Sequence, residues 1–224
     1  MFERVHRWQF ERALRACHES GIPALEAYSA APWPSSDTPV LEAPLMALDF
    51  ELDGLARGAH VLQAGWVAVS YGGIDLFSAR STDVRSLRQL DDQAVIVHGI
   101  GEQRARGGAA LLDTVDLFLR EFAGKIIVAH GASVERDAIA RISKAALGLA
   151  IPVRTVCTLA LERKLKPNLP GGEAYRLAAT RERYNLPAHD QHDALADAIA
   201  AAELLLAQLS RMSADTRLGA IESH

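Results

Sequence analysis

The amino-acid sequence predicts an α/β fold in which a mixed β-sheet is flanked by helices. Three consecutive segments have the pattern of strands: Leu45–Leu52, Val61–Ser70 and Gly73–Ala79. A turn at Gly72-Gly73 would join the second and third of them as a hairpin. After this meander, segments with helical spacing alternate with short apolar runs. A meander followed by alternating helices and strands indicates a mixed sheet covered by helices.

The second half of the chain supplies the alternating elements. Apolar residues recur at helical spacing in five segments, and two short apolar runs are typical of buried strands. The predicted helices are Ala109–Phe122, Ser133–Leu147, Thr158–Lys164, Ala174–Tyr184 and Asp193–Gln208, and the predicted strands are Lys125–Ala129 and Val153–Val156.

The 224 residues divide into three parts by composition. Residues 1–43 form an extension with an amphipathic helix at Phe2–Ala16 and a proline-rich linker. Residues 44–210 form the main domain, and we expect residues 211–224 to be a flexible tail. The N-terminal helix either packs on the main domain or is an arm that binds a partner.

Composition excludes several classes of protein. Two cysteines are too few for a disulfide framework or a zinc cluster. The apolar runs are too short to span a membrane, and the charged N-terminus does not resemble a secretory signal, so we expect a cytoplasmic protein with no membrane partner. The net charge of −4 does not point to a nucleic-acid partner, although bound cations would supply positive charge locally.

Two acids stand in the first predicted strand, which is otherwise apolar. Asp49 and Glu51 are two residues apart, so their side chains project from the same face. Two like charges in an apolar setting are costly unless a cation lies between them, and oxygen ligands favour Mg²⁺ or Mn²⁺. The alternative is an exposed polar face of an edge strand.

A third acid lies where a buried strand meets a helix. Lys125–Ala129 is followed by a helix whose first turn contains Glu135, and ligands gather at the carboxyl ends of strands in α/β sheets. Asp137 is about 200° further round the helix, so only one of the two acids can face the site. Ala138 and Ile139 are the predicted core-facing pair, which favours Glu135. The alternative is an ordinary acid at a helix start.

A histidine and a fourth acid surround the start of the last long helix. Asp193 is predicted to be either the N-cap or an acid of the first turn, which places His192 just before the helix and Asp197 one turn inside it. An imidazole in this position could accept a proton from a water molecule near a cation held by Asp197. The alternative is a capped surface helix with solvated acids.

Together, the three segments resemble the DEDDh exonucleases of the ribonuclease H-like superfamily, the branch that includes the proofreading epsilon subunit of bacterial DNA polymerase III. The resemblance covers about Pro44 to Leu209. Its motifs are Asp49-Phe50-Glu51-Leu52-Asp53-Gly54-Leu55, His98-Gly99-Ile100, Ala129-His130-Gly131-Ala132-Ser133-Val134-Glu135, and the pair His192 and Asp197. Leu52-Asp53 stands where the family has two threonines, Gly131 where it has asparagine, and Glu135 where it has aspartate.

The resemblance implies a ribonuclease H-like fold and a role in one catalytic site for each matching residue. The implied ligands of two divalent cations, Mg²⁺ or Mn²⁺, are Asp49, Glu51, Glu135 and Asp197, with His192 as general base. The residues implied to contact the terminal nucleotide are Leu52, Asp53, Val97, His98 and Val134. The implied reaction is hydrolysis of phosphodiester bonds from the 3′ end of single-stranded DNA or frayed duplex ends, which releases nucleoside monophosphates in proofreading or repair.

Two alternatives remain for the function. The same site would serve an exoribonuclease or oligoribonuclease equally well. A non-catalytic module that binds nucleic acid or a polymerase is the other alternative, and the retention of four carboxylates with His192 argues against it. The expected partners are 3′ ends of single-stranded DNA or RNA, with a DNA polymerase or a second copy of the chain as further candidates.

Overall fold

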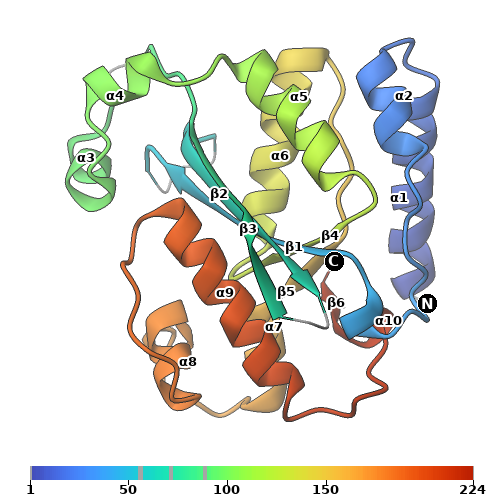
Figure 1. Cartoon of the computed structure of the whole chain (residues 1–224), viewed down its shortest axis with the longest axis vertical. Coiled ribbons are helices and arrows are strands. Elements are labelled where there is room, and N and C mark those ends of the chain that lie inside the picture. Colours follow the sequence, from blue (N-terminus) through green and yellow to red (C-terminus); the bar gives the residue numbers. More distant parts are fainter. Residues whose placement is uncertain (1, 55–57, 71–72, 88–89, 224) are drawn as a thin grey trace.

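The computed structural model describes residues 2–54, 58–70, 73–87 and 90–223. Its centre is one mixed sheet with the strand order β3-β2-β1-β4-β5-β6 (Figure 1). The strands are β1 (Leu45–Leu52), β2 (Val61–Ser70), β3 (Gly73–Asp83), β4 (Ile126–Ala129), β5 (Thr155–Cys157) and β6 (Glu222–Ser223). β1 pairs antiparallel with β2 and parallel with β4, so it lies in the middle of the sheet.

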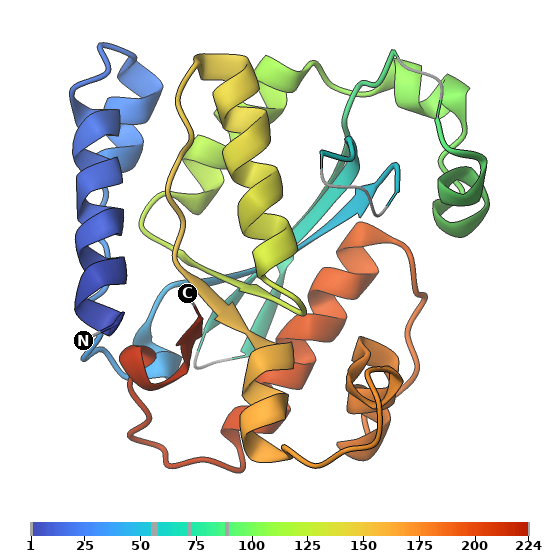
Figure 2. The same ribbon diagram turned by 180° about the vertical axis from the view of Figure 1, so that it is seen from behind.

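Helices cover both faces of this sheet. They are α1 (Phe2–His18), α2 (Pro23–Ser29), α3 (Asp92–His98), α4 (Glu102–Gly107), α5 (Leu111–Phe122), α6 (Ser133–Leu147), α7 (Thr158–Leu165), α8 (Leu177–Arg183), α9 (Ala194–Leu209) and α10 (Leu218–Ile221). Two short 3₁₀ helices, η1 (Val40–Glu42) and η2 (Glu173–Tyr175), complete the described elements. Figures 1 and 2 show α1 and α2 beside the sheet at the opposite side of the molecule from α3 and α4.

Alternation along β1 divides the core into two layers. Met46, Leu48 and Phe50 pack with α5 and α6 in one cluster, which also contains Cys17 and Leu25 of the N-terminal helices. Leu45 and Ala47 face the opposite way, where side chains of α7, α9 and α10 pack against the sheet. Because side chains alternate along a strand, Asp49 and Glu51 follow on the α9 side.

The predicted α/β fold with a mixed sheet is confirmed. The bounds of β1, β2 and α6 match the prediction, whereas the predicted turn lies partly outside the described residues at Gly72. The N-terminal helix packs on the domain through α2, which corresponds to the first of the two alternatives. Of the described residues, none belongs to a helix long and apolar enough to cross a membrane.

The structure corrects two predictions and adds two helices that were not predicted. Residues 211–223 pack on the domain and do not form the predicted flexible tail, because α10 buries Leu218 and Ile221 in the core and β6 pairs with β5. The helices α3 and α4 were not predicted from the sequence. Both are short, and they pack around the cluster of Leu62, Leu90 and Ile100. The predicted helix at Ala174–Tyr184 is broken into η2 and α8.

A close contact between α9 and β2 fixes where the last helix begins. Gly65 pairs with Asp49 across the β1–β2 ladder, and a β-carbon added to it would lie 2.2 Å from the backbone nitrogen of Leu195. The side chain of Gln63 strengthens this contact, because its Oε1 accepts a hydrogen bond of 3.0 Å from the backbone N–H of Ala194. Glycine at position 65 therefore allows the start of α9 to lie directly on the sheet beside Asp49.

We expect Gly65→Ala to force the start of α9 away from β2, because the added methyl group meets backbone atoms that cannot rotate aside. The free energy of unfolding should fall by about 1–3 kcal/mol, the usual cost of overpacking. Urea unfolding would measure this loss. Gly107→Ala is the control, because an added β-carbon there meets no atom within 4 Å; an equal effect of both substitutions would contradict the expectation.

Candidate active site

The acids of β1 lie on the central strand of the sheet. Asp49 is partly buried, and Glu51 is 4% exposed. Their neighbours across the β1–β2 ladder are Gly65 and Gln63. The alternative of an exposed edge strand is therefore excluded, and both carboxylates lie in a water-poor setting below the start of α9.

The loop before α9 turns sharply to place its acid over β1. Asp193 caps the helix, because its carboxylate accepts hydrogen bonds from the backbone N–H groups of Leu195 and Ala196 at 3.1 and 3.0 Å. His192 has a φ of 68°, in the left-handed region. Its backbone N–H donates to Oδ2 of Asp197 at 2.9 Å. Asp197 thus faces the loop and the sheet, whereas Asp193 has the structural role predicted for it.

The two acids at the start of α6 are placed differently. Glu135 is 4% exposed, and Asp137 is exposed to solvent. Ala138 and Ile139 are completely buried, so they face the core as predicted. This burial leaves Glu135 as the acid of α6 that lies toward the carboxylates of β1.

Three of the carboxylates are close enough to share a cation. One ligand atom from each of Asp49, Glu51 and Asp197 lies within 4.8 Å of the other two. Among the described residues, neither Oε1 of Glu51 nor Oε2 of Glu135 has a hydrogen-bond partner, although both atoms are buried. A buried carboxylate oxygen without a donor is unfavourable, and a divalent cation would satisfy it. The residues present therefore fit a metal ion of the hard, oxygen-binding kind.

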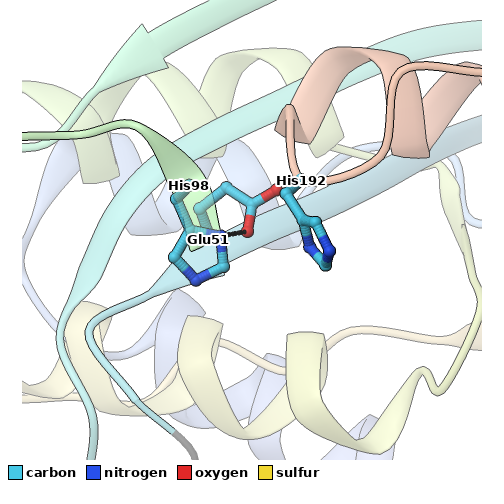
Figure 3. Close-up of side chains that lie close together, drawn as sticks. All are labelled: Glu51, His98 and His192. Carbon is cyan, nitrogen blue, oxygen red and sulfur yellow. Dashed lines mark ion pairs between the residues drawn. The ribbon is translucent and has the colours of Figure 1, made fainter. Parts of the chain in front are cut away.

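Two imidazole rings flank the Glu51 carboxylate. Figure 3 shows Glu51 between the rings of His98 and His192, and Nδ1 of His98 pairs with Oε2 of Glu51. The two ring centroids are 5.8 Å apart. His98 is the last residue of α3, so this short helix, which the sequence analysis did not predict, carries a site residue from outside the sheet.

The other residues predicted to contact substrate differ in how exposed they are. Val97 and Val134 are 43% and 48% exposed, so both present apolar surface to solvent beside site residues. Leu52 is half-buried at the end of β1. Oδ1 of Asp53 accepts a hydrogen bond of 2.6 Å from the backbone N–H of His60, and the contact of Asp53 with substrate stays a prediction. This bond closes the connection between β1 and β2, while Leu55 of the same motif lies outside the described residues.

Sequence analysis missed one residue of the site. Nε2 of His189 lies 2.7 Å from Oδ1 of Asp197, and the histidine side chain is 11% exposed. The buried guanidinium of Arg181 anchors the chain on both sides of the site loop by donating to the carbonyls of Pro187 and Ala200. His189 belongs to an irregular loop, so apolar periodicity does not single it out.

Comparison with known proteins identifies the family. The family model described as "Exonuclease" (RNase_T) matches residues 46–205, which include all of the carboxylates described above. The chain belongs to this exonuclease family. No curated protein sequence is similar enough to the chain to count as a match.

Solved exonuclease structures share the fold of the chain. Exonuclease X in complex with 5′ overhanging duplex DNA is 24% identical, with a TM-score of 0.60 over 78% of this chain and 97% of that one. The zinc-bound complex of E. coli exonuclease I with single-stranded DNA is 15% identical, with a TM-score of 0.67 over 76% of this chain. The match spans only 41% of exonuclease I. The sheet and its helices thus form the ribonuclease H-like fold of these exonucleases.

The acids of this exonuclease-family site hold their protons unusually strongly in the absence of cations. Burial raises the pKa of Glu135 from its ordinary value of 4.5 to about 8. Burial also raises the pKa of Asp49 well above its ordinary range, and the nearby carboxylates, first those of Glu135 and Asp197, raise it further. A cation bound at this site would have to displace protons at neutral pH.

We expect the metal-free protein to lose stability as the pH rises. For Glu135, the stabilising contribution of the protonated form is complete below the unfolded pKa near 4.5 and is lost as the pH rises through about 8, because the folded state holds the proton more tightly. Glu135→Gln should flatten this part of the profile. Urea unfolding in EDTA across this range would measure it, with exposed Asp137→Asn as the control. Parallel profiles for Glu135→Gln and the wild type would contradict the assignment.

Proposed function

We propose that the chain is a 3′-to-5′ exonuclease that hydrolyses phosphodiester bonds at the 3′ end of single-stranded DNA or frayed duplex ends. The observation that carries this proposal is the convergence of Asp49, Glu51 and Asp197 around one point, with buried Glu135 beside them. A nuclease needs mainly charge neutralisation and positioning, and this cluster supports both. Membership of the exonuclease family supports the same reaction class.

The proposed ligands of two cations, Mg²⁺ or Mn²⁺, are Asp49, Glu51, Glu135 and Asp197. When bound, such cations would neutralise the charge of the scissile phosphate and make a nearby water molecule more acidic. Glu135 and Asp49 give up their protons on binding, because the charged form is the one that coordinates. His189 holds Oδ1 of Asp197, and the backbone of His192 holds Oδ2, which together fix the direction of this carboxylate.

The proposed general base is the imidazole of His192. Its ring lies beside the Glu51 carboxylate, and among the described residues it has no acid paired with it as His98 and His189 have. A ring nitrogen of His192 would take the proton from the attacking water as the oxygen bonds to phosphorus. In the same displacement the bond from phosphorus to the 3′ oxygen would break, and this oxygen would take up a proton from solvent. The products would be a nucleoside 5′-monophosphate and a shortened strand with a new 3′ hydroxyl.

The exposed apolar surfaces of Val97 and Val134 would support the terminal base, and Leu52 would contact it from the end of β1. Assignment to the DEDDh branch, with an epsilon-like role in proofreading or repair, follows from the same motifs and is part of this proposal. The cytoplasmic location, a polymerase partner, self-association and the division into residues 1–43 and 44–210 remain predictions.

We expect the chain to shorten a 5′-labelled single strand from its 3′ end only when Mg²⁺ or Mn²⁺ is present. Gel electrophoresis with EDTA as the negative control would measure this, and an RNA strand of the same sequence would separate the two polymer classes. Glu135→Ala should lower the rate by about 100-fold or more through loss of cation binding. Asp137→Ala is its control on the same helix. Full activity in excess EDTA, or a rate loss confined to Asp137→Ala, would overturn the proposed site.

We expect substitutions of the two histidines in the loop before α9 to affect different steps. His192→Ala should keep Mn²⁺ affinity and slow single-turnover cleavage by about 10²–10⁴-fold, the usual contribution of a general base. His189→Ala should instead weaken Mn²⁺ affinity by about 10–100-fold and regain most of its rate at saturating Mn²⁺. Calorimetric titration beside single-turnover rates would distinguish the two. A wild-type cleavage rate for His192→Ala would show that this histidine is structural.

A further inference from the structure

A cavity of about 340 Å³ is lined by none of the carboxylates of the acidic site. It is formed by the start of β2, the segment that follows β3, the start of α5 and the middle of α6. Val84, Leu111 and Ile142 are among its apolar lining residues. Sites for small ligands are usually mostly apolar with a few polar groups, and this volume is at the lower end of their range. We call this cavity the basic pocket.

The polar lining of the basic pocket is cationic. Arg85 and Arg141 both line it, and neither pairs with a carboxylate among the residues that the structure describes. Each guanidinium is anchored to the backbone by one contact: Nε of Arg85 donates to Gly108, and Nη1 of Arg141 donates to Ala59. The remaining nitrogens of each group are thus available to an anion, and guanidinium groups bind phosphate oxygens in a two-pronged geometry.

A buried hydroxyl group in the basic pocket also lacks a partner. Ser86 is 4% exposed and lines the cavity, and its Oγ has no hydrogen-bond partner within the described part of the chain. Its backbone is fixed, because the N–H of Ser86 donates to Ala105 at 3.0 Å. Buried hydroxyl groups are nearly always satisfied in folded proteins, so this one points to a ligand with an acceptor or donor.

Two links connect the basic pocket to the acidic site. His60 lines the pocket and is bonded through its backbone to Asp53, two residues after Glu51. Arg141 and Glu135 lie on the same helix, and six residues of α6 span about 9 Å along its axis. One short strand of nucleic acid could therefore contact both places.

We propose that the basic pocket binds one nucleotide unit, with its ring against the apolar residues and its phosphate between Arg85 and Arg141. An apolar floor alone would suit many ligands, and two guanidinium groups alone would suit any anion. Their combination with a hydrogen-bonding hydroxyl matches the three parts of a nucleotide. The nucleotide belongs either to the substrate strand behind its 3′ end, in which case the inference rests on the proposed function, or to a free nucleotide.

The test measures binding in EDTA, so that no hydrolysis takes place. The probes are a fluorescein-labelled single strand of about twelve thymidines, within the usual site size of single-strand binders, a thymidine dinucleotide, and free dAMP. Arg85→Glu removes the phosphate contact, and Ala145→Trp fills the basic pocket from an exposed position on α6. Arg80→Glu is the charge control, because this exposed arginine also donates to backbone carbonyls but does not line the pocket.

If the substrate strand is the source, both pocket variants should weaken binding of the long strand by about tenfold and leave the dinucleotide unchanged. Arg85→Ala should also reduce the slope of log affinity against log salt by about one. If a free nucleotide is the source, the tenfold loss should appear with dAMP. Arg80→Glu should bind every probe as the wild type does.

Three results would overturn the pocket assignment: wild-type affinity of both pocket variants for every probe, a loss in Arg85→Glu without one in Ala145→Trp, or no binding of any probe to the wild type. Cleavage of the dinucleotide with Mn²⁺ is measured separately and should be unchanged by the control Arg80→Glu. Failure of that cleavage in the wild type would instead count against the proposed function, because binding in EDTA does not depend on catalysis.

Discussion

The carboxyl groups crowded around Asp49 destabilise the fold, and packing in the rest of the structure has to offset this destabilisation. Each is brought there by an element with its own apolar packing: Glu51 by β1, Glu135 by α6 and Asp197 by α9. Like charges in a water-poor space repel, and burial disfavours their charged forms, so the metal-free site retains protons. The packing of the two core layers therefore offsets a site that is unfavourable until cations occupy it.

Small side chains determine how closely these elements approach. The buried face of α9 is rich in alanine, and its first turn lies against the backbone at Gly65. A helix with larger side chains on this face would be lifted from the sheet, and Asp197 would no longer reach the ligand atoms of Glu51. The small side chains thus give up some stabilising apolar contact and allow the carboxylates to lie closer together. Apolar periodicity predicted where α9 packs on the sheet, but it did not predict how closely α9 approaches the sheet.

The sequence predicted what periodicity and local chemistry determine. β1 and α6 were predicted with the correct bounds because their apolar spacing is strong. The predicted inward face of α6 also distinguished the buried Glu135 from the exposed Asp137. α3, α4 and β6 are short and are held by tertiary contacts, so the local sequence has no signal for them. The contact of His189 with Asp197 depends on how an irregular loop folds back, which no repeating pattern records.

The proposed nucleic-acid substrate is compatible with the net negative charge of the chain. A net charge of −4 includes the carboxylates of the site itself, which repel a phosphate backbone when free and attract it when cations are bound. Arg85 and Arg141 have no acidic partner among the described residues, and a guanidinium group acts over about one Debye length, so both would attract a nearby strand whatever the total charge is. Acids arranged to hold cations, together with a few local arginines, would permit an acidic protein to bind a polyanion. The spacing of the acids is therefore stronger evidence for a cation-binding site than the number of acids in the chain.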